Sequence, residues 1–239
     1  MMRTRAGVEK AEVEKAEVEK AEVEEAENAE DEGAQRAREH AQRVSLGELI
    51  RDTEAEGPGR RAALWVRGCP LRCPGCCNPE LLEFDAPGPD APTVGALLET
   101  LSRGGEEGVS LLGGEPFAHA ETLAPLAEGL RAAGKSVMIY SGFTLRQLRR
   151  RAAEEPFTAR LLSACDLLVD GPYLEAQRSE ERRWIGSRNQ GLHFLSGFYD
   201  PADPRFRERN TVELRLDGER LLVNGWPLEG VELLRRRES

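Results

Sequence analysis

The sequence predicts an α/β protein built on a parallel sheet, and three observations lead to that fold class. Short apolar segments alternate four times with amphipathic helical segments over residues 62–169, with short connections between them, which is typical of a parallel sheet with crossover helices. A polar or glycine-rich motif directly follows each expected strand. Hydrophobic residues make up 39% of the 239 residues, enough for one core.

Each element has its own signal. The expected strands are Ala62–Arg67, Val109–Leu112, Ser136–Tyr140 and Asp166–Val169. The expected helices are Thr93–Leu101, Ala120–Ala133, Thr144–Ala153 and Phe157–Ala164. Thr93 has the residue type of an N-cap, and Gly134 that of a helix end. Near the C-terminus, Asp217-Gly218 between two apolar runs predicts a β-hairpin over residues 211–223.

The N-terminal segment has a different character. Residues 8–27 repeat a pentapeptide rich in Glu, Lys and Ala, with valine at every fifth position. Five residues advance an α-helix by about 140°, so the valines spiral around the axis and form no stripe that a core could bury. We expect residues 1–43 to be a low-complexity charged tail, helical or disordered, before a globular domain over residues 44–239.

Composition argues against several classes of protein. A formal net charge of −10 disfavours general nucleic-acid binding, which needs basic patches. No apolar run approaches the roughly 18 residues of a membrane span, and the N-terminal residues lack the apolar stretch of a secretory signal. The expected location is therefore the cytoplasm.

Four of the five cysteines fall between positions 69 and 77. An odd count, tight clustering and no secretory signal argue against a disulfide framework and favour metal or redox chemistry. Cys69, Cys73 and Cys76 form a C-x3-C-x2-C motif, in which three thiolates can hold three irons of a [4Fe–4S] cluster and leave the fourth open to a substrate. Gly75 permits a tight approach to such a cluster. Cys165 is expected to be a buried core residue, and His119 a helix cap or a solvated side chain.

The motifs that follow the strands are expected to meet. They are Cys69–Asn78, Gly113–Pro116, Ser141–Gly142 and Asp170–Pro172. Ligands of parallel α/β sheets bind outside the carboxyl ends of the strands. Four separate segments should therefore converge on one edge of the sheet, where a site is expected.

Two motifs together resemble those of the radical SAM superfamily. They are C-x3-C-x2-C after the first strand and Gly-Gly-Glu-Pro, at Gly113–Pro116, after the second. The resemblance implies an incomplete (βα) barrel that binds a [4Fe–4S] cluster and S-adenosylmethionine (SAM), and an enzyme that cleaves SAM reductively to a 5′-deoxyadenosyl radical. It implies Cys69, Cys73 and Cys76 as iron ligands. The implied cofactor-binding residues are Gly75, Cys77, Gly113, Gly114, Glu115, Pro116, Ser141 and Asp170.

A narrower resemblance runs from about Val44 to Phe194. Segments at 68–80, 140–144, 166–172 and 186–190 are similar to those of activating proteins of anaerobic ribonucleoside-triphosphate reductase. This implies an oxidoreductase that makes a glycyl radical on a partner enzyme, with a ferredoxin or flavodoxin as electron donor. Neither nucleic acid nor a membrane is an expected partner. The chain departs from the family at Cys77, where relatives usually carry an aromatic residue near the SAM adenine.

Several alternatives stay open at this point. The motif also suits a radical SAM enzyme that modifies a peptide or small molecule, or a non-catalytic zinc module. Cys77 competes with Cys76 as a ligand, although the spacing favours Cys76. Glu115 either contacts the SAM amino group or binds backbone groups only, and Ser141 and Asp170 are either SAM contacts or turn residues.

A bulky residue at Gly114 is expected to block SAM while sparing the cluster. The arginines of residues 146–151 form either a solvated helix face or a docking patch for an acidic partner.

Overall fold

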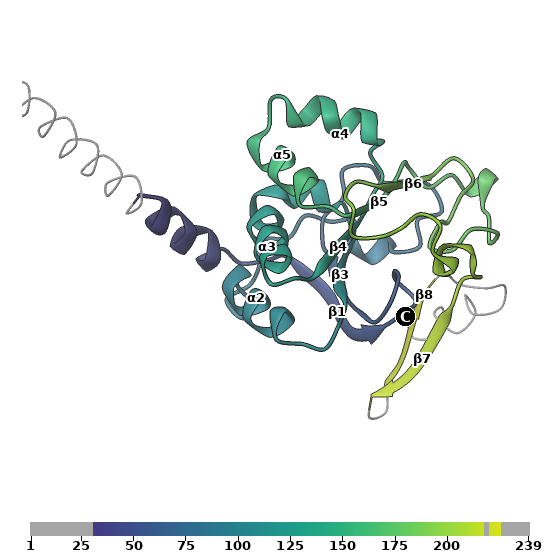
Figure 1. Cartoon of the computed structure of the whole chain (residues 1–239), viewed down its shortest axis with the longest axis horizontal. Helices are drawn as coiled ribbons and strands as arrows, with labels where there is room; N and C mark the ends of the chain where they lie inside the picture. The colour runs from purple at the N-terminus through teal and green to yellow at the C-terminus, as the bar shows by residue number, and fades with distance from the viewer. Residues whose placement is uncertain (1–30, 218–219, 226–239) are drawn as a thin grey trace, which may run out of the picture. The chain divides into compact units, whose positions relative to one another are not determined.

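The computed structural model describes residues 31–217 and 220–225, and divides into two compact units at Ala41 and Gln42. In the first unit, residues 31–41 are helical. The repeat over residues 8–27 lies outside the described residues. The second unit holds the sheet and all four motifs that are expected to converge (Figure 1).

The second unit is a mixed α/β structure around a six-stranded sheet of order β1-β2-β3-β4-β5-β6. The strands are β1 Leu46–Thr53, β2 Arg61–Val66, β3 Gly108–Gly113, β4 Ser136–Ser141, β5 Leu167–Asp170 and β6 Gly191–Phe194. The four central strands are parallel, and β1 and β6 pair antiparallel at the two edges. The four predicted parallel strands are therefore confirmed, and no boundary shifts by more than one residue.

Four α-helices connect or follow these strands. They are α2 Val94–Ser102, α3 Ala120–Ala132, α4 Leu145–Ala152 and α5 Pro156–Ser163. Thr93 caps α2 as predicted, because its side chain accepts a hydrogen bond from the Ala96 N–H group. At α4, Thr144 and Gln147 form a reciprocal capping box that fixes where the helix begins. Short 3-10 helices occur at Pro79–Leu81 (η1), Pro116–His119 (η2), Glu175–Gln177 (η3) and Pro204–Arg207 (η4).

The two faces of the sheet pack differently. One face carries Leu64, Leu111 and Ile139 and is covered by the helices, as Figure 1 shows for α2, α3 and α5. Side chains alternate across a strand, so their neighbours Trp65 and Met138 point to the other face, where loops return to cover them. The helix-covered face forms the largest apolar core.

A buried arginine ties the C-terminal part of the unit to the second face. Arg61, at the start of β2, is fully buried and donates to the hydroxyl groups of Ser110 (2.9 Å), Ser136 (2.8 Å) and Tyr199 (2.8 Å). It also donates to the Val109 carbonyl at 2.7 Å. A buried charge is tolerated when its donors are paired. The arginine lies at the amino ends of the strands, away from the expected site.

Two strands of the sheet are absent from the sequence prediction. β1 pairs with β2 through register shifts between Leu46 and Glu48 and between Ile50 and Thr53, and it mixes polar and apolar residues without regular alternation. β6 has only four residues and begins at Gly191. Neither strand carries a periodic apolar signal, so each is recognised as a strand only by its pairing, β1 with β2 and β6 with β5.

The predicted C-terminal hairpin is present as β7 Val212–Asp217 and β8 Arg220–Gly225, which pair antiparallel. Gly218 of the predicted turn lies outside the described residues. Within the described parts of the chain, no helix combines the length and apolarity that crossing a bilayer requires.

Candidate functional site

The four motifs predicted to converge do lie at one edge of the sheet. Val66, the last residue of β2, pairs in register with Gly113, and Ser141 of β4 pairs with Asp170 of β5. Each motif therefore leaves its strand at the same level. The carboxyl edge of the parallel strands carries the cysteine loop, the glycine turn, Ser141-Gly142 and Asp170-Gly171 together.

The cysteine loop is anchored where it begins. The N–H groups of Gly68 and Cys69 donate to the Leu81 and Leu82 carbonyls at 2.8 Å and 3.0 Å, which ties the loop to η1. Within it, Cys76 N–H donates to the Cys73 carbonyl at 3.2 Å. Arg72 and Gly75 adopt positive φ angles of 46° and 71°, which curl the chain between the cysteines. The loop thus holds its three motif thiols on one short, folded segment.

The thiols of this loop differ in environment. Burial raises the pKa of Cys69 and of Cys73. A hydrogen bond with the Cys77 side chain lowers the pKa of Cys76 to about 6, although burial opposes that shift. Cys77 itself is exposed, and all four thiols are free of disulfides. The pairing of the adjacent thiols favours Cys76 over Cys77 as the thiolate, which is the form that binds metal.

The glycine turn packs directly on the strand that leads into the cysteine loop. Gly114 N–H donates to the Val66 carbonyl (2.7 Å), and Glu115 N–H donates to the Gly68 carbonyl (2.9 Å). A side chain at Gly114 would overlap the Gly68 backbone, with its Cβ 2.6 Å from the carbonyl carbon. This close approach needs glycine whether or not a ligand is bound. We therefore expect a bulky residue at Gly114 to disturb the Gly68 backbone, which leads into the cysteine loop, as well as any ligand.

Glu115 is fully buried and joins the glycine turn to the end of β4. Its Oε1 accepts from Phe117 N–H (3.0 Å) and from the Ser141 hydroxyl (2.9 Å), and its Oε2 accepts from Gly142 N–H (2.8 Å). Ser141 Oγ in turn accepts from Phe143 N–H at 3.1 Å. Both side chains are thus hydrogen-bonded within the protein, and Glu115 binds the Ser141 hydroxyl as well as backbone N–H groups. Burial raises the pKa of Glu115 to about 7, against the opposing effect of these hydrogen bonds.

Replacing Glu115 by glutamine should test this role. The glutamine side chain has one oxygen, so its NH2 group would face at least one of the N–H or O–H groups that donate to Glu115 in the parent. We expect this lost hydrogen bond to lower the free energy of unfolding by about 1–3 kcal/mol. A carboxyl whose pKa is raised on folding stabilises the fold at low pH. The parent should therefore lose on the order of 3 kcal/mol as the pH rises from 4.5 to 7, and E115Q should lack that slope. Denaturant melts across this range measure both, and an unchanged slope in E115Q would assign the dependence to other groups.

Residues that follow β5 also lie against the cysteine loop. The backbone of Tyr173 hydrogen-bonds the Cys73 thiol, and a Cβ at Gly75 would lie 3.0 Å from the Glu175 carboxyl carbon. Asp170 is buried, and its two oxygens accept from Leu145 N–H (2.6 Å) and Gly191 N–H (3.1 Å). The Asp170 side chain therefore joins β5 to α4 and β6.

Several neighbours of the site have no signal in the sequence. A side chain at Gly142 would overlap Leu71 of the cysteine loop, so Leu71 covers that turn. His119 precedes α3 but makes no side-chain cap, and its ring instead lies 5.7 Å from that of Phe84. These contacts join residues far apart in sequence, so no local pattern could have shown them. Cys165 is buried as predicted, and its thiol donates to the Leu167 carbonyl at 2.9 Å.

The segment that holds these motifs is similar to known proteins. The model of the 4Fe-4S single cluster domain family matches residues 55–193. The anaerobic ribonucleoside-triphosphate reductase-activating protein of Escherichia coli K12 is 30% identical over 148 residues, which cover 58% of this chain and 91% of that protein. The protein of the same name from Enterobacteria phage T4 is 27% identical over 57% of this chain and 85% of its own length.

Among solved structures, QueE from Escherichia coli is similar with a TM-score of 0.39 and 21% identity, over 46% of this chain and 57% of that one. The curated relatives confirm the resemblance predicted from the motifs, and the family match confirms the predicted [4Fe–4S] cluster. The chain belongs to the 4Fe-4S single cluster domain family and is a relative of the activating proteins of anaerobic ribonucleoside-triphosphate reductase.

Proposed function

We propose that this protein is a radical SAM enzyme that generates a glycyl radical on a partner enzyme, an anaerobic ribonucleoside-triphosphate reductase. The observation that carries this proposal is the direct packing of the glycine turn at Gly113–Pro116 on the residues that lead into Cys69. A ligand held by the turn would lie beside the cysteine loop. The relatives named as reductase-activating proteins support the choice of partner.

The cysteine loop fits an iron–sulfur cluster better than a single ion. Cys69, Cys73 and Cys76 are free thiols on one loop, yet no three His, Cys, Asp or Glu side chains of the described residues gather as one metal ion would require. Thiols spread along a loop suit a cluster, because each can take its own iron. When bound and reduced, such a cluster supplies the electron that splits SAM into methionine and a 5′-deoxyadenosyl radical.

The glycine turn suits the amino group of SAM. Gly114 and Glu115 already donate their N–H groups to the Val66 and Gly68 carbonyls, and Pro116 has no N–H group. The turn can therefore offer carbonyl oxygens, which accept hydrogen bonds from an ammonium group. Glu115 and Ser141 act as positioning residues for this turn. Gly75 and Cys77, within the cysteine loop, and Asp170, at the end of β5, would complete the proposed binding site.

The rest of the proposal follows from the family. The largely parallel sheet would form the wall of an incomplete (βα) barrel. The electron would come from a ferredoxin or flavodoxin. The radical would remove a hydrogen atom from a glycine Cα of the reductase, which leaves 5′-deoxyadenosine and the glycyl radical. Neither step asks a side chain of this protein to act as an acid or a base.

Anaerobic reconstitution with iron and sulfide, followed by dithionite and SAM, tests the activity. We expect a protein with roughly four irons per chain that forms 5′-deoxyadenosine and methionine in equal amounts. With an anaerobic ribonucleoside-triphosphate reductase added, paramagnetic resonance should show a protein-based glycyl radical. A cluster-loaded protein that releases no 5′-deoxyadenosine would contradict the proposal. Stoichiometric zinc with no iron uptake would favour the non-catalytic alternative, and cleavage without a glycyl radical would favour a peptide or small-molecule substrate.

A further inference from the structure

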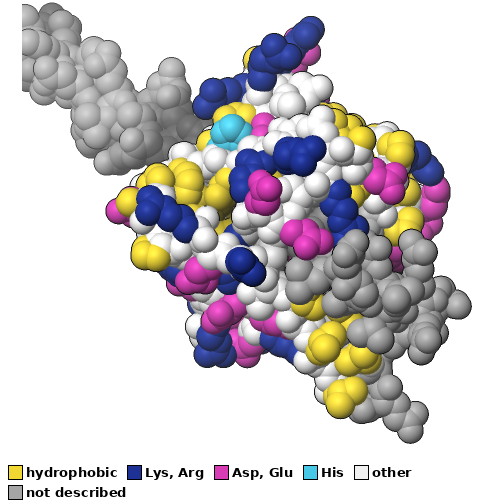
Figure 2. All heavy atoms as spheres, turned by 90° about the vertical axis from the view of Figure 1, so that its right-hand side faces the viewer, with side chains coloured by type: hydrophobic (Ala, Val, Ile, Leu, Met, Phe, Trp, Pro, Cys, Tyr) yellow, Lys and Arg dark blue, Asp and Glu magenta, His cyan; other side chains and the backbone are white. Residues whose placement is uncertain are grey.

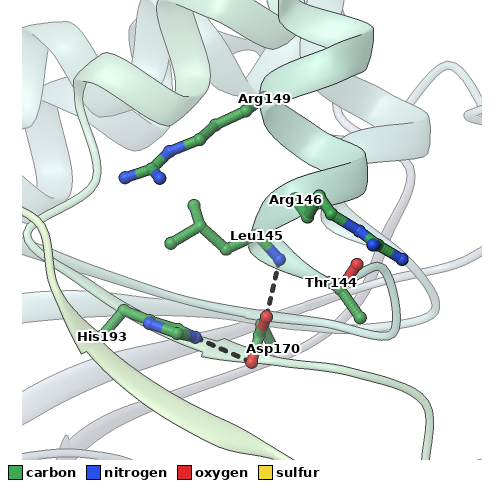
Figure 3. A pocket seen from close by; sticks show the side chains of 6 residues that line it. All are labelled: Thr144, Leu145, Arg146, Arg149, Asp170 and His193. Carbon is green, nitrogen blue, oxygen red and sulfur yellow. Dashed lines mark hydrogen bonds and ion pairs between the residues drawn. The ribbon is translucent and has the colours of Figure 1, made fainter.

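A pocket of about 500 Å³ opens beside the site, where α4 begins. It is lined by Thr144, Leu145, Arg146, Arg149, Asp170 and His193 (Figure 3). These residues come from the first turns of α4, the end of β5 and the edge strand β6. Leu145 follows the Ser141-Gly142 turn by three residues, so the pocket adjoins the proposed SAM site at the same edge of the sheet.

The charge of this pocket is positive and uncompensated. Arg146 and Arg149 are exposed, and neither makes an ion pair or hydrogen bond with any residue that the structure describes. Figure 3 shows the Arg149 side chain extending above Leu145 on the side of His193, and the Arg146 side chain extending the other way, on the side of Thr144. On the same helix, by contrast, Arg151 pairs with Glu155 at 2.9 Å.

The one carboxylate of the pocket does not cancel these charges. Asp170 accepts two backbone N–H bonds, and its Oδ1 lies 2.9 Å from His193 Nε2. The dashed lines of Figure 3 mark how it faces Leu145 and His193 and not the arginines. In Figure 2, Lys and Arg side chains gather at the top of the molecule, where α4 lies in Figure 1. The chain as a whole carries a net charge of −10, so these unpaired arginines form a local basic feature on an acidic protein.

We propose that this pocket docks an acidic segment of the protein on which the enzyme acts, with its Asp or Glu carboxylates against Arg146 and Arg149. The inference rests on the proposed function, because it places a protein substrate next to the SAM site. Two free guanidinium groups on successive helix turns match two carboxylates of one segment, since guanidinium pairs with carboxylate in a fixed fork geometry. Such charges act mainly by steering association, and their effect weakens as salt rises.

The test is the double charge reversal Arg146→Glu/Arg149→Glu in the full-length, cluster-loaded protein. Its affinity for an intact anaerobic ribonucleoside-triphosphate reductase should fall at least tenfold at low salt, mostly through a slower association rate. The yield of glycyl radical at limiting reductase should fall with it. SAM cleavage without the reductase should stay at the parental rate, because neither arginine touches the cysteine loop or the glycine turn.

The control for net charge is Arg103→Glu/Arg150→Glu, which changes that charge equally; Arg103 differs from the pocket arginines in that it pairs with exposed Glu99 at 2.8 Å. Arg150 lies on α4 but outside the pocket, and Arg103 follows α2. This control should keep the parental affinity. Equal losses in both double variants would show that net charge alone matters, and unchanged affinity in Arg146→Glu/Arg149→Glu would show that the pocket does not dock the reductase. Either result overturns the inference.

A mixed-sequence DNA duplex serves as a second probe. If the parent binds the duplex as tightly as the reductase, and the pocket variant loses both, the pocket is a general polyanion site and the inference fails. Failure of the proposed function is separate, because it appears as absent SAM cleavage in the parent. The binding measurements do not depend on SAM.

Discussion

Alanine at Cys69, Cys73 or Cys76 is expected to abolish the broad visible absorbance of the reconstituted protein and to lower its iron content from roughly four per chain to near zero. Each thiol would hold a different iron, so the loss of one opens the cluster at a second corner. The loop is fixed by backbone hydrogen bonds of Gly68, Cys69 and Cys76. A neighbouring group therefore has little freedom to replace the missing ligand.

The two remaining cysteines are the internal controls. Cys165 is buried in the core, and burial raises the pKa of its thiol, so Cys165→Ala should keep its iron. Cys77→Ala should also keep its iron, because Cys77 is exposed and supports Cys76 through a hydrogen bond. A cluster that survives in Cys76→Ala and disappears in Cys77→Ala would show that the ligand assignment is wrong. Iron analysis and visible spectra under anaerobic conditions make the comparison.

Valine at Gly114 is expected to lower the free energy of unfolding by about 3 kcal/mol, which corresponds to a fall in Tm of roughly 6–12 °C. Its Cβ would overlap the Gly68 backbone, and backbone at the end of a buried strand has little room to move. Because Gly68 directly precedes Cys69, the displacement should also disturb the cysteine loop. Iron content and 5′-deoxyadenosine formation should therefore fall together.

Gly105→Val is the matched control, since a Cβ at exposed Gly105 meets no atom within 4 Å. That variant should melt, bind iron and cleave SAM like the parent. A Gly114→Val protein with a full cluster and no SAM cleavage would show that the turn contacts SAM without constraining the loop. Parental behaviour of Gly114→Val in all three measurements would reduce Gly113–Pro116 to an ordinary turn.

The sequence by itself determined the features that depend on local pattern. Apolar runs of strand length and helices with one apolar face indicated the four parallel strands and the four helices. Parallel strands place their carboxyl ends at one edge, so the order of elements also indicated that Cys69, Gly113, Ser141 and Asp170 would meet. The C-x3-C-x2-C spacing is itself a local feature, and it selected three of the five cysteines.

Only the tertiary structure decided what these residues contact. Glu115 is a buried acceptor for the end of β4, and Gly114 is required by the backbone of Gly68. The edge strands β1 and β6, the buried Arg61 and the Asp170–His193 contact likewise depend on partners far away in the chain. A residue's type restricts what it can bond, but its partner is set by which segments the fold brings together. That choice is made by the packing of the whole domain, which no window of the sequence contains.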